Sequence, residues 1–268
     1  MLTDSHCHLA SHKFPPEEVA DLVAHANQSG VTRLVSLATC LDDIEANLAI
    51  AAAHENVHCC IGIHPCDVHH APDDVIARLR PYLSNPNVCA IGETGLDYYH
   101  PAPDGWTDDD FRQRQRDFLD AHFKLASENG LNVVIHTRDR SADASLQDAL
   151  NIYKKHASSV RAVFHCFISS PENAQAVIAL GGLLSFGGVA TFKNASEVLD
   201  LVASLEATTF MLESDSPYLA PHPFRGQRNE PRHVRTIAEK IAQARAQSVE
   251  SLAEETNRTA FGFFRGIE

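Results

Sequence analysis

Residues 132–136 read NVVIH, a short run of β-branched apolar residues that ends in a histidine. A run that is apolar on both faces predicts a buried strand of a parallel sheet covered by helices. Seven similar runs occur elsewhere in the chain, each short enough for one strand. The eight runs cover residues 2–8, 33–39, 57–64, 88–92, 132–136, 161–165, 182–186 and 208–213.

The segments between these runs have helical spacing and carry helix start signals, such as Pro171 in a first turn and Asn194 in a capping position. The predicted helices cover residues 42–54, 73–83, 108–129, 141–156, 171–180, 194–205, 230–246 and 249–264. Strands that alternate with helices pair in parallel through crossover connections. The pattern therefore predicts an α/β fold, a TIM-type (β/α)8 barrel in a single domain over residues 1–268. A doubly wound open sheet is the alternative, but the sequence has neither a GxGxxG turn nor a P-loop.

The composition is that of a globular protein, with 44% hydrophobic and 21% charged residues. A formal net charge of −13 disfavours non-specific binding along duplex nucleic acid, but it does not exclude binding of one strand end at a local positive site. The seven cysteines include no C-x-x-C pair, which is typical of a reducing compartment. The sequence shows no signal peptide and no apolar run long enough to span a membrane. We therefore expect a cytoplasmic protein without membrane contact and without a stable protein partner.

Several predicted strands are followed or ended by a histidine or an acid. These residues are His6, His8, His64, Glu93, His136, His165 and Asp215. The active site of a TIM barrel lies at the C-terminal ends of its strands. So many polar residues at one end are hard to explain as packing, because buried charged groups need partners or metals. His6 and His8 alternate with Cys7 along a strand, so the two imidazoles share a face and can bind one ion.

Six of these side chains, all except His64, are too many for one catalytic zinc, which takes three protein ligands and a water. We expect two divalent ions, Mg, Mn or Zn, with His6, His8 and Asp215 on one, His136 and His165 on the other, and Glu93 bridging both. In the expected reaction the ions activate a water and Asp215 accepts its proton, so Asp215 and Glu93 are the predicted catalytic residues. Glu213 has two interpretations: it orients a ligand histidine, or it is a buried structural acid.

Cations near the predicted strand ends suit the binding of a phosphate. Lys193 follows the seventh run, and Arg225 and Arg228 follow the eighth. TIM barrels often bind phosphate with the loops after these two strands. Arg138, two residues after the fifth run, adds a further donor. These four cations and His64 form the predicted substrate-binding set.

Longer motifs resemble the TatD family of metal-dependent hydrolases. They are SHCHLA (5–10), GIHP (62–65), GETGLDYY (92–99), VVIHTRD (133–139), FHCF (164–167), ESDSPYLAPHPFRGQRNEP (213–231) and NRTAFGFF (257–264). The resemblance implies a TIM barrel and a metal-dependent nuclease, often a 3′→5′ exonuclease on single-stranded DNA or RNA. It places the metal ligands on the same six residues. Two segments depart from the family pattern: Ile168–Ser169 replace a small turn, and the loop 100–110 is longer and carries Trp106. That tryptophan either stacks a base or caps the barrel rim.

Other functions remain open from the sequence. The first hypothesis is a phosphodiesterase that uses single-stranded nucleic acid ends as substrate. The second is an amidohydrolase-like amide or ester hydrolase, including aminoacyl-ester cleavage. Many amidohydrolases bridge two metals with a carboxylated lysine at the end of the fourth strand, where this chain has Glu93. Its lysines Lys13, Lys124, Lys154, Lys155 and Lys240 lie elsewhere. A third hypothesis, a metal-holding scaffold, fits poorly because closed structural sites leave no room for water and substrate.

Overall fold

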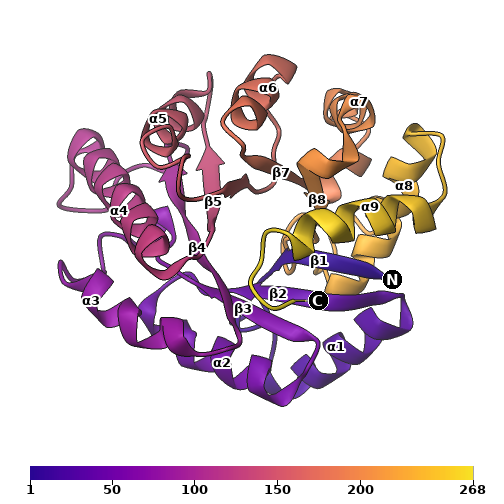
Figure 1. Cartoon of the computed structure of the whole chain (residues 1–268), viewed down its shortest axis with the longest axis horizontal. Coiled ribbons are helices and arrows are strands. Elements are labelled where there is room, and N and C mark those ends of the chain that lie inside the picture. Colours follow the sequence, from indigo (N-terminus) through magenta and orange to yellow (C-terminus); the bar gives the residue numbers. More distant parts are fainter. Residues whose placement is uncertain (268) are drawn as a thin grey trace.

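The computed structural model describes residues 1–267 and contains eight parallel strands arranged around a common axis (Figure 1). They are β1 (Leu2–Cys7), β2 (Val31–Leu37), β3 (Val57–Ile61), β4 (Val88–Asp97), β5 (Val133–Arg138), β6 (Ala162–Phe164), β7 (Leu183–Phe186) and β8 (Phe210–Leu212). Each strand pairs with the next one in the sequence. An isolated parallel bridge between Cys7 and Ser216 joins β1 to the segment after β8. The barrel is nearly closed, and the predicted fold class is confirmed.

Helices surround the strands as an outer layer (Figure 1). They are α1 (Val19–Gln28), α2 (Ile44–Ala53), α3 (Val75–Leu79), α4 (Asp108–Asn129), α5 (Ala144–Tyr153), α6 (Pro171–Ala179), α7 (Ser196–Ser204), α8 (Val234–Ala244) and α9 (Val249–Phe261). Helix α1 covers residues over which no helix is predicted from the sequence. The predicted helix 73–83 is divided into α3 and a 3-10 segment, Arg80–Ser84, where Pro81 lacks the N–H that an α-helical hydrogen bond needs. Within residues 1–267, no helix is both long and apolar enough to cross a membrane.

Apolar side chains form one core between the strands and the helices and a second core inside the barrel. In β2, Leu34 belongs to the outer core and Val35 to the inner one. Ser36 again points outward, where its Oγ lies 2.6 Å from Oδ1 of Asn47 in α2. This alternation explains why the predicted strands are apolar on both faces.

The inner core is closed at one end by the C-terminal segment. Phe263, Phe264 and Ile267 are buried against side chains of the barrel interior. The guanidinium of Arg265 donates to the carbonyl of Val88, the first residue of β4, at 2.6 Å. The segment therefore covers the end where the strands begin, and the opposite end of the barrel remains for the functional site.

Strand β4 extends to Asp97, whereas the predicted strand ended at Gly92. The prediction was wrong because it followed apolar runs, and the extension, ETGLD, contains buried polar residues. Alternate residues of a strand share a face, so Glu93, Gly95 and Asp97 point the same way. Gly95 has a φ of 146°, and a Cβ at this position would clash with the carbonyl of His136 in the paired strand β5. The glycine therefore permits the close pairing of these two site-bearing strands.

Candidate metal centre

The six predicted metal ligands converge where the strands end. His6 lies in β1 and His8 directly follows it, Glu93 lies in β4 and His136 in β5, and His165 and Asp215 follow β6 and β8. Five of the six are buried, and His136 is partly buried. The structure thus brings together side chains that are far apart in the sequence, since His6 and Asp215 are separated by 209 positions. Strand ends that are remote in sequence meet because the barrel closes.

The carboxylate of Glu93 joins two groups of side chains. Its Oε2 lies 3.5 Å from Nε2 of His6 and 3.5 Å from Nε2 of His8. Its Oε1 lies 3.1 Å from Nδ1 of His136 and 2.9 Å from Nε2 of His165. Asp215 belongs to the first group, since its Oδ1 lies 3.5 Å from Nε2 of His8. Each carboxylate oxygen of Glu93 therefore faces a different pair of imidazoles.

The spacing of the imidazole nitrogens fits two ions. Nε2 of His6 and Nε2 of His8 are 3.2 Å apart, as are Nδ1 of His136 and Nε2 of His165. Two nitrogens bound to one tetrahedral zinc at about 2.0–2.1 Å are separated by about 3.3–3.4 Å. Nitrogen and carboxylate donors in this number also suit the common divalent catalytic metals. The residues present therefore fit the expected metal pair.

Hydrogen bonds determine which nitrogen of two of these rings faces the cluster. Nδ1 of His8 lies 3.1 Å from the carbonyl of Leu37, so this nitrogen carries the proton and Nε2 keeps a lone pair. Nε2 of His136 lies 3.1 Å from Oδ2 of Asp97, which places its proton there and frees Nδ1. Partners of this kind orient metal-ligating histidines in many proteins.

Asp97 is a site residue that the sequence interpretation missed. It is 1% exposed, and its Oδ1 accepts the backbone N–H groups of Tyr99 and His100 at 3.0 and 2.9 Å. Burial opposes its ionisation, but the contact with His136 and these amides hold its pKa well below the usual range. The signal was present in GETGLD, where Asp97 stands four residues after Glu93 and therefore on the same strand face.

His64 lies beside the cluster, and its Nδ1 forms a hydrogen bond outside the cluster. Burial lowers the pKa of His64 to about 3, so the ring is neutral and carries one proton. Its Nδ1 accepts the N–H of Cys66 at 3.1 Å, which leaves the proton on Nε2. Nε2 lies 3.6 Å from Oε1 of Glu93. His64 thus presents an N–H donor to the site, which suits a substrate oxygen better than a metal ion.

The two acids of the cluster remain ionised despite their burial. Desolvation would raise the pKa of Glu93, but the nearby charge of His165 and the contact with His136 lower it well below its usual value. The pKa of Asp215 is likewise raised by burial and lowered further by the contact with His8 and the neighbouring rings, with a net decrease. Anionic oxygens are the form that binds a divalent cation.

Glu213 is fully buried behind the cluster. Its Oε1 accepts the N–H of Cys166 at 2.7 Å, and its Oε2 accepts a hydrogen bond from Ser185. Nδ1 of His165 lies 3.6 Å from Oε1, too far for a hydrogen bond. Glu213 thus holds the turn after β6, as a structural acid would, and its carboxylate also raises the pKa of the neighbouring His165.

Two of the predicted phosphate-binding cations lie on adjoining loops. Lys193 lines a hollow of about 400 Å³ with Thr191 and His222. The guanidinium of Arg225 lies 3.6 Å above the ring of Phe192, the neighbour of Lys193. The loops after β7 and β8 therefore contact each other.

Arg138 and Arg228 also contact other side chains of the protein. The guanidinium of Arg138 stacks on Tyr99 at 4.2 Å from the ring centre. Arg228 pairs with Glu18 at 2.6 Å and donates to the carbonyl of Lys13 at 3.0 Å. Arg228 thus ties the loop after β8 to the segment before α1, and its charge is already compensated.

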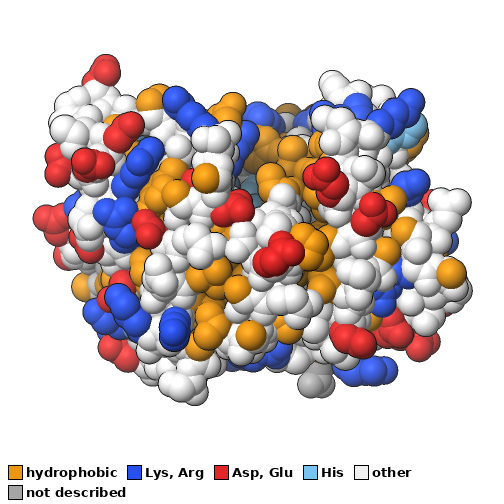
Figure 2. Space-filling model, turned by 90° about the horizontal axis from the view of Figure 1, so that it is seen from above, with side chains coloured by type: hydrophobic (Ala, Val, Ile, Leu, Met, Phe, Trp, Pro, Cys, Tyr) orange, Lys and Arg blue, Asp and Glu red, His pale blue; other side chains and the backbone are white. Residues whose placement is uncertain are grey.

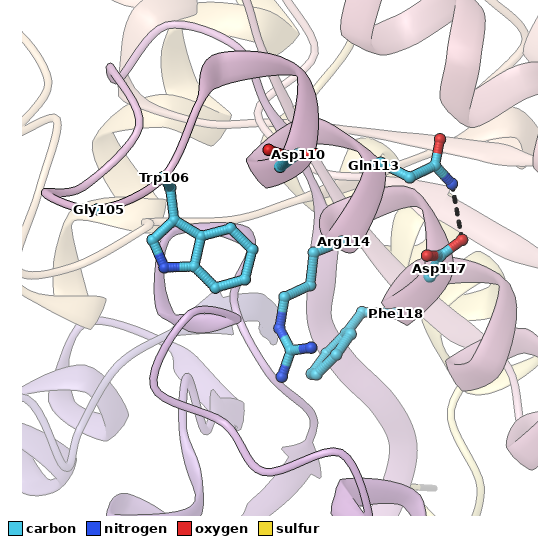
Figure 3. A pocket seen from close by; sticks show the side chains of 7 residues that line it. All are labelled: Gly105, Trp106, Asp110, Gln113, Arg114, Asp117 and Phe118. Atoms are coloured by element: carbon cyan, nitrogen blue, oxygen red, sulfur yellow. Dashed lines mark hydrogen bonds between the residues drawn. The ribbon is translucent and has the colours of Figure 1, made fainter.

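Trp106 packs against the first turns of α4 (Figure 3). With Gly105 and residues of α4 it lines a hollow of about 470 Å³. The guanidinium of Arg114 lies 5.7 Å from its ring centre and 4.8 Å from that of Phe118. Arg114 also donates to the carbonyl of Val68 at 2.8 Å. The tryptophan therefore attaches its loop to helix α4.

Comparison with known proteins identifies the family of this chain. The profile of the family described as TatD related DNase matches residues 3–265. The chain belongs to the TatD family. It is 32% identical over 266 residues to the uncharacterized metal-dependent hydrolase YabD of Bacillus subtilis, and the match covers 99% of both chains. It is also 32% identical to YcfH of Escherichia coli, another uncharacterized metal-dependent hydrolase, with 95% of this chain and 92% of YcfH covered.

A solved structure supports the same assignment. The TatD homologue YjjV of Escherichia coli superimposes with a TM-score of 0.85 at 26% identity, over 98% of this chain and 97% of YjjV. Family membership and these relatives show that this TatD-family chain is a metal-dependent hydrolase.

Proposed function

We propose that this TatD-family chain hydrolyses phosphodiester bonds as a 3′→5′ exonuclease on the ends of single-stranded DNA or RNA. The observation that carries the proposal is the position of Glu93 between two pairs of imidazoles (His6 and His8, His136 and His165). Two divalent ions bound there would lower the pKa of a water toward about 7 and polarise a phosphoryl oxygen. The six ligand side chains would hold the ions in place.

The side chains of the chain then have separate tasks. Asp215 is ionised and lies beside His8, so it can accept the proton of the attacking water. His64 presents its Nε2–H toward the cluster and can donate to a substrate oxygen. Lys193 and Arg225 lie in contacting loops and can neutralise a phosphate.

Charge and ligand chemistry favour a phosphodiester substrate over an amide or ester. Glu93 holds the bridging position in the buried cluster, and the lysines within residues 1–267 are all exposed, so a carboxylated lysine does not bridge the ions as in many amidohydrolases. Figure 2 shows acidic and basic side chains interspersed over one face rather than gathered in a long basic track. With a net charge of −13, binding would depend on the local cations, which suits a strand end.

A substrate panel tests this proposal. Single-stranded DNA and RNA with a 5′ label, each with a free or a blocked 3′ end, would be incubated with the chain and Mg²⁺, Mn²⁺ or Zn²⁺. Bis-p-nitrophenyl phosphate and an aminoacyl ester would be included. We expect stepwise shortening of the free 3′ ends and resistance of the blocked strands and of the ester.

The variant His136→Ala should lose this activity, whereas His25→Ala, which removes an exposed histidine of α1, should retain it. Cleavage within the blocked strands would show that the chain is an endonuclease and not an exonuclease. Rapid hydrolysis of the aminoacyl ester, with the oligonucleotides left intact, would show that the chain is an ester hydrolase and not a phosphodiesterase.

A further inference from the structure

A second group of potential metal ligands lies next to the six ligands of the candidate metal centre. Cys66 belongs to the 3-10 segment Pro65–Asp67 after β3, Asp97 ends β4, and His100 follows three residues later. Sγ of Cys66 lies 3.6 Å from Nδ1 of His100, and this nitrogen lies 3.0 Å from Oδ2 of Asp97. All three donor atoms are within 4.8 Å of one another. We call this group the Cys66 cluster.

Two of the three donor separations lie close to those around a tetrahedral ion. With zinc–sulfur and zinc–nitrogen bonds of about 2.3 and 2.0–2.1 Å, a bound thiolate and imidazole are about 3.6 Å apart. That is the observed separation of Cys66 Sγ and His100 Nδ1. A nitrogen and an oxygen ligand would be about 3.3–3.4 Å apart, so the pair His100–Asp97, at 3.0 Å, needs only a small adjustment.

The accessibility of the cluster allows an ion to enter. Asp97 is buried, Cys66 is partly buried and His100 is exposed, with 48% of its side-chain surface accessible. Three protein ligands leave one tetrahedral position for water or a substrate oxygen, as in catalytic rather than structural zinc sites. A thiolate donor selects zinc or cobalt over magnesium or manganese, which prefer oxygen ligands.

We propose that Cys66, Asp97 and His100 form a third cation site, selective for zinc-like ions and adjacent to the metal pair. Asp97 connects the two sites, because the oxygen that faces His100 also accepts the Nε2–H of His136 at 3.1 Å. Occupation of the third site therefore acts on a ligand of the pair through one carboxylate. The inference concerns metal binding and does not depend on which bond the enzyme cleaves.

Cobalt titration of the full chain tests the proposal. Cobalt bound to a thiolate gives a charge-transfer absorption that cobalt on nitrogen and oxygen ligands lacks. Wild type should show this absorption at saturation, and Cys66→Ala and His100→Ala should lose it. Cys40→Ala removes another partly buried cysteine and should keep it. Zinc analysis should find one ion less per chain in Cys66→Ala than in wild type, with the same thermal midpoint in metal-free buffer.

A conservative variant separates coordination from packing. Cys66→His offers an imidazole in place of the thiolate, so it should restore the wild-type zinc content without the charge-transfer absorption. The proposal is overturned if saturated wild type shows no such absorption, if Cys66→Ala retains it, or if zinc content is the same in wild type and Cys66→Ala. Loss of nuclease activity alone would bear only on the proposed function.

Discussion

Oδ2 of Asp97 lies 3.1 Å from Nε2 of His136 and thereby determines that Nδ1 of this ring faces Glu93. The other oxygen of Asp97 is occupied by the N–H groups of Tyr99 and His100. One carboxylate thus fixes both its own orientation and the tautomer of a predicted metal ligand. This relationship predicts a specific failure when the acid becomes an amide.

Asp97→Asn should reverse the tautomer of His136. The amide oxygen would stay on the two backbone N–H groups, so the amide NH₂ would face Nε2 and force the ring proton onto Nδ1. We expect the affinity of the metal pair for Mn²⁺ to fall by about 10–100-fold. Competition with a chelator measures it. Cys66→Ala should leave Mn²⁺ affinity unchanged, and an unchanged affinity in Asp97→Asn would refute the tautomer argument.

Asp215→Asn keeps the size and one oxygen of the side chain but removes the charge and the proton acceptor. Phosphodiester cleavage should fall by at least about 10²-fold. The fold should survive, because Asp215 has a φ of 53°, a conformation that asparagine tolerates well. Turnover, metal content and thermal midpoint of the same sample give the answer. Near-normal turnover at full metal content would exclude Asp215 as the base.

Lys193→Ala should weaken substrate binding without changing metal content. Loss of one charge-assisted contact to phosphate corresponds to roughly a 10-fold rise in KM. The salt dependence of binding to single strands should indicate about two or three neutralised phosphates in wild type and about one fewer in the variant. Arg228→Ala is the matched control, since its charge is already paired with Glu18. A steep slope in wild type would instead reveal an extended basic surface.

His122 should make the fold sensitive to acid. Its ring is fully buried. Nδ1 lies 2.7 Å from the carbonyl of Phe118, and Nε2 accepts the N–H of Ile63. Burial lowers the pKa of His122 to about 4. The unfolded chain, with a pKa of about 6.5, binds the proton first. The free energy of unfolding should therefore fall by up to about 3 kcal/mol as the pH falls from about 6.5 to about 4.

Urea unfolding of the chain in chelator, at several pH values, measures this dependence. His122→Gln keeps a neutral donor and acceptor but does not titrate, so its unfolding free energy should depend less steeply on pH in this range. Parallel pH profiles for wild type and variant would show that His122 does not contribute.

Most of the architecture could be predicted because its signals are local. Apolar runs on both strand faces, helical spacing and capping residues are properties of short segments. The same holds for the six predicted ligands, since a strand-end position in a barrel defines a shared location. The predicted fourth strand ended at Gly92 for the same reason: its second half, ETGLD, contains buried polar residues, and a search for apolar runs does not detect it.

The sequence by itself therefore determined the barrel and the set of side chains that meet at its rim. The tertiary structure decided which atoms of those side chains face one another. Asp97 determines which nitrogen of His136 faces the cluster, the backbone N–H of Cys66 determines which nitrogen of His64 carries its proton, and Glu18 pairs with Arg228, one of the predicted phosphate-binding cations. These outcomes depend on hydrogen bonds and ion pairs that form only when the folded chain brings the partners within about 3 Å. Strand periodicity sets which face a residue occupies, but not its partner across the barrel.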